Sequence, residues 1–170
     1  MDAMQALYSR RSIRKYTSES ISEQAIKELL EAAMSAPSAG NQQPWHFVVI
    51  HDRKLLDQIP SLHPHSLMCR EAQVAILVCG DPTLEKHVGY WVQDCAAATE
   101  NLLVAVHARG LGGVWVGVYP REERVIGFRK LLHIPEHVIP FALIPLGHPA
   151  EEKPPRPDRY SEARIHKNLW

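Results

Sequence analysis

Apolar residues recur at helical spacing in several parts of the chain. The clearest stripe follows Ser20 and Ser22, either of which can cap a helix. It stops near Ala36, because Pro37 disfavours helical geometry in the residue before it. The stripe consists of Ile21, Ala25, Ile26, Leu29, Leu30 and Ala33. Further helices are predicted over residues 3–8, 53–59, 88–109 and 122–132, of which 88–109 is the longest and the richest in alanine.

Short apolar runs between these helices predict strands over residues 47–50, 74–79, 114–118 and 138–146. Helices and strands alternate irregularly, which favours an α+β fold over a regular βαβ array. After Gly147 the chain is rich in proline and charge, and its few apolar residues cannot form a core. This tail is expected either to be disordered or to lie extended across another surface.

Composition narrows the possible functions. The chain has 170 residues, the size of one domain. Its 19 basic residues balance 19 acidic ones, so nucleic-acid binding driven by bulk charge is not expected. No apolar run reaches the ~18–20 residues of a membrane span, and the charged N-terminal segment lacks the apolar core of a signal peptide. Three scattered cysteines form no disulfide framework, so a cytoplasmic setting without a membrane partner fits best.

Two polar segments could bind a ligand. Arg10, Arg11, Ser12 and Arg14 follow the first helix, and arginine forks with a serine hydroxyl suit a phosphate group. The alternative for this segment is a solvated basic stretch. The loop over residues 37–45 offers amide groups that can hydrogen-bond the edge of a planar heterocycle. Its alternative is a simple connection between a helix and a strand.

Two other patterns do not carry a recognisable site. The glycines of residues 110–113 follow a helix and open a strand, whereas a dinucleotide-binding glycine loop follows a strand and opens a helix. They are therefore expected to end the helix and permit a tight turn. Among ten histidines only His63 and His65, with Cys69 nearby, are clustered, and no metal-binding spacing is present. No metal is predicted.

Four segments together show a pattern. They are RRSIRKY at residues 10–16, APSAGNQQPWHFVV at 36–49, GLGGVWVG at 110–117 and IPLGHPAEEKPPRP at 144–157. In this order, and with a basic C-terminal tail, they resemble the nitroreductase family of flavoenzymes, particularly its short single-domain members. The resemblance covers nearly the whole chain.

The resemblance implies an α+β fold with a central, mostly antiparallel sheet flanked by helices. It also implies an intertwined homodimer that binds FMN at the subunit interface. Residues 1–148 would form the FMN-binding domain, and residues 149–170 a C-terminal extension that packs on the partner subunit.

The resemblance assigns the FMN contacts residue by residue. Arg10, Ser12 and Arg11 would hold the phosphate and ribityl end, and Arg14 would face N1 and O2 of the flavin. Asn41, with Gln43, would contact the pyrimidine edge, while Pro37, Ser38 and Ala39 would come from the other subunit. The backbone N–H groups of Val116 and Gly117 would approach N5 and O4. Arg159, or failing that Arg156, would be the late phosphate ligand.

The implied activity is hydride transfer from NAD(P)H through FMN to an electron-poor acceptor such as a nitroaromatic or a quinone, in a ping-pong cycle. The flavin carries the chemistry, so no catalytic side chain is expected. Val116 stands where some larger members of the family carry glutamate, which leaves donor and substrate specificity open. Three alternatives remain: a flavin-storing module without turnover, a flavin-dependent reductase or dehalogenase of another small molecule, and a metal protein using His63, His65 and Cys69.

Overall fold

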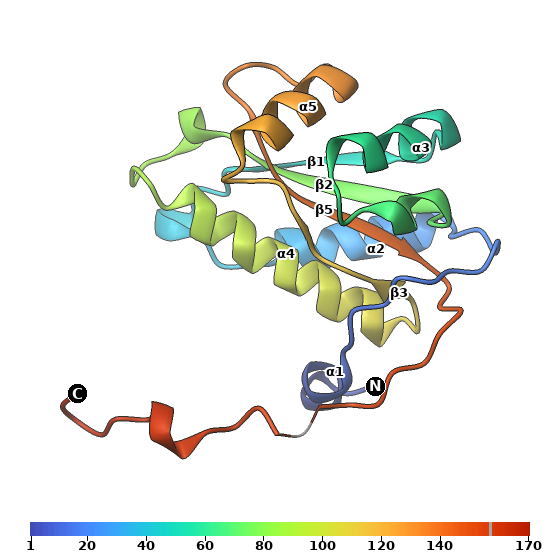
Figure 1. The fold of residues 1–170 in the computed structure, drawn as a ribbon. Coiled ribbons are helices and arrows are strands. Elements are labelled where there is room, and N and C mark those ends of the chain that lie inside the picture. The colour runs from blue at the N-terminus through green and yellow to red at the C-terminus, as the bar shows by residue number, and fades with distance from the viewer. Residues whose placement is uncertain (157) are drawn as a thin grey trace.

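The computed structural model describes residues 1–156 and 158–170. Its centre is a five-stranded sheet in the order β1-β2-β5-β3, with β4 also paired to β5 (Figure 1). The strands are β1 (Trp45–Ile50), β2 (Val74–Gly80), β3 (Gly112–Gly113), β4 (Val116–Gly117) and β5 (Ile139–Gly147). Every pairing between these strands is antiparallel, which confirms the predicted sheet.

Helices cover both faces of this sheet, as Figure 1 shows. The helices are α1 (Ala3–Ser9), which packs on α4 and not on the sheet, α2 (Glu23–Met34), α3 (Arg53–Leu62), α4 (Trp91–Ala108) and α5 (Glu122–Leu132). The helices α2 and α4 pack on one face, and α3 and α5 on the other. All seven residues of β2 are buried between these layers, which explains why its sequence is continuously apolar instead of alternating.

Two predicted helix boundaries are corrected by the structure. Helix α4 begins at Trp91 and not at Val88, because Gly89 has a φ of 90° and breaks the helical path. The Glu85 carboxylate accepts the Trp91 backbone N–H (2.8 Å) at the new start. Helix α2 is capped by Ser22, whose hydroxyl accepts the Ala25 N–H, and it ends at Met34.

Of the strand predicted over residues 114–118, only Val116–Gly117 forms a strand (β4), and the short strand β3 lies just before it at Gly112–Gly113. The chain is extended there, but Val118 and Tyr119 both donate their backbone N–H to the Phe141 carbonyl, so the regular ladder ends after Gly117. Val114, Val116 and Val118 still alternate into the core beneath α3 and α5.

The C-terminal tail first runs along the body of the protein and then extends away from it. Pro149 bridges to Tyr16, and the Ala150 N–H donates to the Lys15 carbonyl (2.9 Å). Farther on, the tail extends away from the body of the protein (Figure 1). Its apolar side chains there are exposed: Tyr160, Ile165, Leu169 and Trp170. Pro157, in the fourth motif, lies outside the described residues.

No helix in the described part of the chain is long and apolar enough to cross a bilayer.

Candidate functional site

A basic cavity of about 340 Å³ lies where the segment after α1 meets the tail. It is lined by Arg10, Arg11, Ser12, Arg14, Lys153, Arg156 and Arg159. The structure thus brings together the predicted phosphate-binding residues and both candidates for the late arginine. Six of the seven lining residues are cationic, and no carboxylate is among the described residues that line the cavity. Such a site suits a doubly charged phosphate monoester.

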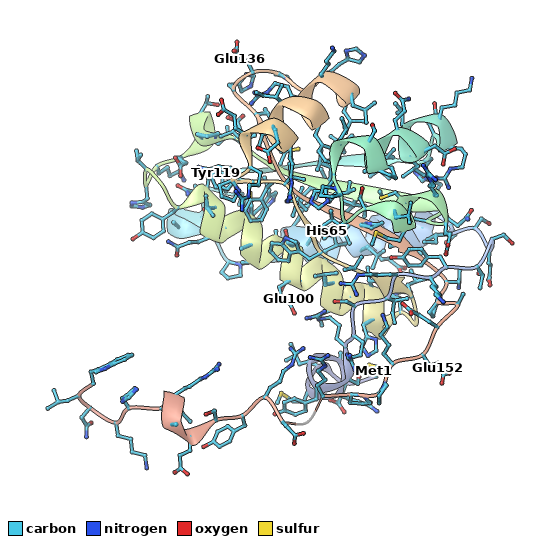
Figure 2. All side chains as sticks on the ribbon, viewed as in Figure 1. Met1, His65, Glu100, Tyr119, Glu136 and Glu152 are labelled. Atoms are coloured by element: carbon cyan, nitrogen blue, oxygen red, sulfur yellow. The ribbon has the colours of Figure 1, made fainter. Side chains whose placement is uncertain are left out.

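The basic segment over residues 10–14 is held in place by contacts with carboxylates and through its backbone groups. Glu100, which leaves α4 on the side facing α1 (Figure 2), lies 3.3 Å from the Nε of Arg10. The Glu151 carboxylate accepts the Arg14 backbone N–H (2.6 Å) and pairs with the Lys153 ammonium (2.8 Å). Hydrogen bonds from Lys153 and from Arg14 lower the pKa of Glu151. Lys153, which the sequence analysis missed, also donates to the Ser12 carbonyl.

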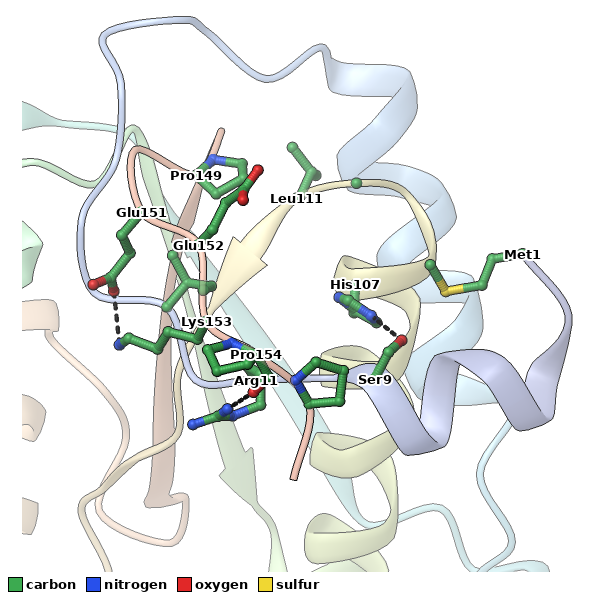
Figure 3. Close-up of a pocket in the computed structure, with 13 residues that line it drawn as sticks. Met1, Ser9, Arg11, His107, Leu111, Pro149, Glu151, Glu152, Lys153 and Pro154 are labelled. Atoms are coloured by element: carbon green, nitrogen blue, oxygen red, sulfur yellow. Dashed lines mark hydrogen bonds and ion pairs between the residues drawn. The ribbon is translucent and has the colours of Figure 1, made fainter. Parts of the chain in front are cut away.

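A second, more apolar cavity of about 660 Å³ adjoins the basic one and shares Arg11 and Lys153 with it (Figure 3). On its wall the Nε2 of His107 lies 2.7 Å from the Ser9 hydroxyl. That hydroxyl donates its proton to the Gln5 carbonyl (2.7 Å), so His107 must be the donor in the pair. Burial, and then the positive charge of Arg10, lower the pKa of His107. This hydrogen bond connects α1 to α4. Because His107 donates in it, the two side chains are not arranged as a nucleophile with its base.

An extended strip of backbone leads away from the basic cavity. The Ile13 N–H donates to the Gly113 carbonyl (3.0 Å), so the strip starts beside Ser12. Four extended residues then span roughly 13 Å to Gly117. A Cβ added at Gly117 would meet no atom within 4 Å.

The space over Gly117 lies next to aromatic side chains. Trp115 and Tyr119 are 36% and 38% exposed, and edge-to-face contacts connect both of them to the Phe141–Trp91 pair. The Val116 side chain is buried, so only its backbone faces this strip. A flat ring could therefore approach bare backbone at Gly117.

Gly117 is fixed from the opposite side by His63. The His63 Nε2 donates to the Gly117 carbonyl (2.9 Å), which also accepts from Arg124 (2.9 Å). The His63 Nδ1 accepts the His65 backbone N–H (3.1 Å), so the proton of the neutral ring is on Nε2. Burial lowers the pKa of His63.

The hydrogen bonds of His63 therefore orient the Gly117 backbone. Within residues 1–156 and 158–170, no group of three His, Cys, Asp or Glu side chains is placed to hold a metal ion. Burial raises the pKa of the Cys69 thiol to about 12. In the sequence, only the proximity of His63 and His65 marked this cluster. Gly117, the hydrogen-bond partner of His63, lies 54 residues away.

No residue of the 37–43 loop is among the described residues that line the basic cavity. Its Ala39 N–H donates to Asp94 in the first turn of α4, whereas His107, which lines the adjoining larger cavity, lies in the last turn. At 1.5 Å per residue the two α4 residues are about 20 Å apart. Within the loop, the Asn41 N–H donates to the Ser38 carbonyl, and the Gln43 N–H donates to the Ser38 hydroxyl. The predicted loop residues thus form one turn.

The Nitroreductase family model matches residues 7–79 and 61–148, nearly the whole chain. The chain belongs to the nitroreductase family. A relative from Methanothermobacter thermautotrophicus, provisionally named NADH dehydrogenase/NAD(P)H nitroreductase, is 52% identical over all of this chain and 88% of its own length.

Solved structures of nitroreductases share this fold. A Parabacteroides distasonis protein with the same provisional name has a TM-score of 0.94 at 38% identity, over 99% of this chain and 98% of that one. A provisionally assigned nitroreductase from Desulfovibrio desulfuricans, solved in complex with FMN, has a TM-score of 0.82 at 34% identity, over 99% and 98% of the two chains. The predicted family and α+β nitroreductase-like fold are confirmed.

We expect the free energy of unfolding of this protein to fall as the pH drops below about 6.5, the ordinary pKa of histidine. Burial lowers the pKa of His63 in the folded protein, so the unfolded chain takes up the proton first. The contribution of neutral His63 is complete above that pH and is lost as the pH falls toward the lowered pKa.

The variant His63→Gln keeps an N–H donor for Gly117 but does not titrate. Its free energy of unfolding, measured by urea denaturation, should change less than that of the wild type between about pH 7 and about pH 5. Both proteins retain His107, so the difference isolates His63. Superimposable pH profiles for the two proteins would contradict this role.

Proposed function

We propose that the protein is an FMN-dependent oxidoreductase that takes hydride from NAD(P)H and passes it to an electron-poor acceptor such as a nitroaromatic or a quinone. The observation that carries the proposal is the basic cavity joined to an open backbone strip at Gly117. The cavity fits the phosphate of FMN in charge, and the strip leaves room for a ring. The Desulfovibrio neighbour, which binds FMN, supports the choice of cofactor.

At the phosphate end, Arg10, Arg11 and Ser12 would hold FMN together with Arg159 or Arg156. Lys153 lines the same cavity and adds a further cation. At the ring end, the backbone N–H groups of Val116 and Gly117 would face N5 and O4. Their side chains do not obstruct this, because Val116 is buried and Gly117 has none.

The loop residues would come from a second copy of the chain. Pro37, Ser38 and Ala39 share one turn with Asn41 and Gln43, so one subunit supplies them all. This turn is anchored at Asp94 in the first turn of α4, and none of its residues is among the described residues that line the basic cavity. We therefore infer a homodimer in which each site combines the basic cavity of one subunit with the loop of its partner. The exposed apolar side chains of the tail beyond residue 158 would pack on that partner, so that residues 149–170 extend the domain of residues 1–148.

When bound, FMN would accept hydride from NAD(P)H and deliver it to the second substrate in a ping-pong cycle. The Arg14 guanidinium would stabilise negative charge at N1 and O2 of the ring. No side-chain nucleophile is needed: the Ser9 proton points to Gln5, and burial raises the pKa of both Cys69 and Cys79 to about 12. Three reduced, buried cysteines suit a reducing compartment such as the cytoplasm.

We expect the purified protein to bind one FMN per subunit and to bleach anaerobically when NADH or NADPH is added. Absorption spectra with each nucleotide, followed by chromatography of heat-released cofactor, test donor and cofactor together. An acceptor should then restore the oxidised spectrum. Release of FAD, or no flavin after reconstitution, would contradict the cofactor assignment. A bound flavin that stays oxidised with both nucleotides would instead indicate storage.

Replacing Arg14 should affect the ring more than the phosphate. Arg14→Ala should retain FMN, lower its midpoint potential and slow hydride acceptance by the equivalent of about 2–4 kcal/mol, because a preorganised charge contact is lost. Arg10→Ala should mainly weaken FMN binding. Arg70→Ala removes an exposed arginine that does not line the basic cavity and serves as a control. Identical effects of Arg14→Ala and Arg10→Ala on affinity and potential would show that the two roles are not divided.

A further inference from the structure

We propose that Asp94 and Gln42 form a buried positioning pair that holds the 38–43 loop in the shape required at the FMN site. The inference rests on the proposed function, but neither residue is among those assigned to touch the cofactor. Asp94 is only 4% exposed and Gln42 only 7%. Gln42 belongs to the loop but has a buried side chain, whereas its neighbours Asn41 and Gln43 are exposed.

Two hydrogen bonds run from the loop to the Asp94 carboxylate. Its Oδ1 accepts the Ala39 backbone N–H (3.0 Å), and its Oδ2 accepts the Gln42 side-chain amide (2.6 Å). The Gln42 Oε1 then accepts the backbone N–H groups of Lys86 (2.9 Å) and His87 (3.1 Å). The pair therefore joins the loop, the segment before α4 and the first turn of α4.

The chemistry of this pair allows only one arrangement. The Gln42 NH₂ must face the carboxylate, and its oxygen must face the two backbone N–H donors. A flipped amide would place its oxygen against the carboxylate and its NH₂ against the N–H groups. A buried carboxylate is costly unless it is hydrogen-bonded, and here both oxygens have partners. The N-terminal turn of α4 also favours an anion at position 94.

The loop needs such an anchor because its backbone is strained. Gly40, Asn41 and Gln43 have φ values of 53°, 53° and 49°. Glycine and asparagine tolerate this left-handed region, but glutamine is strained there. Strained conformations of this kind persist only where the surrounding structure holds them. Gly40 in addition lies against His87, since a Cβ there would come within 2.6 Å of the His87 Nε2.

In this arrangement the residue that anchors the loop differs from the residues that are available to a ligand. The Gln42 side chain is buried and fixed, while its neighbours Asn41 and Gln43 are held in left-handed conformations with exposed side chains. Loss of the anchor should let the loop relax, and the exposed amides would then no longer be preorganised for a ligand.

A swap of the two side chains tests the pair. Asp94→Asn leaves one acceptor for two donors, and Gln42→Glu places two carboxylates face to face. The double variant Asp94→Asn/Gln42→Glu restores every hydrogen bond, with the negative charge moved to position 42. Gln93→Glu adds a charge to an exposed site in the same helical turn and is the matched control.

Two readouts are needed. In the cofactor-free protein, hydrogen exchange at the Ala39, Asn41 and Gln43 amides should be about 10- to 100-fold faster in each single variant, as expected for a lost charged hydrogen bond. The affinity for added FMN should fall in the same proportion. The double variant should return both quantities close to wild type, and Gln93→Glu should leave both unchanged.

Wild-type exchange in the single variants, or no recovery in the double variant, would overturn the pair as the anchor of the loop. If exchange follows the swap while FMN affinity is equal in all variants, the assignment of this loop to the FMN site is overturned. Failure of the wild type itself to bind FMN would refute the proposed function. The exchange measurements on the same proteins would still decide whether the pair holds the loop.

Discussion

The length of α4 is the constraint on which the arrangement of the candidate site depends. Three of its side chains hold other segments: Asp94 the loop, Glu100 the Arg10 guanidinium, and His107 the Ser9 hydroxyl at the end of α1. The helix is largely buried against the sheet and α2, so the spacing of these anchors is fixed. One chain consequently anchors its loop at the first turn of α4 and the segment after α1 farther along the same helix. On our account, the loop of a second subunit completes the site at the basic cavity.

The basic cavity is the second element of the account. Cationic side chains gathered in one small space repel one another, and the cluster is tolerable because Glu100 and Glu151 lie behind it and solvent reaches it. Binding of a phosphate would relieve the remaining repulsion. A chain with no net charge can therefore still present a strongly positive site, since none of its described acidic residues lines the cavity.

Local patterns predicted much of this structure. The bounds of α5 match the sequence periodicity, and the motif order led to the cationic residues of the cavity. The early end of the strand predicted over residues 114–118 was missed, because it depends on the Phe141 carbonyl of another strand. Lys153 and Asp94 were missed for the same reason: their partners are distant in sequence, and neither periodicity nor local motif encodes such contacts.

The central claim, that each site is shared between two chains, is tested most directly by mixing two defective variants. One carries Arg10→Ala and Arg14→Ala, and the other carries Gly40→Val, whose side chain would collide with His87 at a positive φ. Heterodimers purified through two different tags then contain one site with every defect and one site with none. We predict one FMN per heterodimer and almost none in either homodimer. Heterodimers that bind no FMN, although the wild type does, would show that the basic cavity and the loop serve the same site from a single chain.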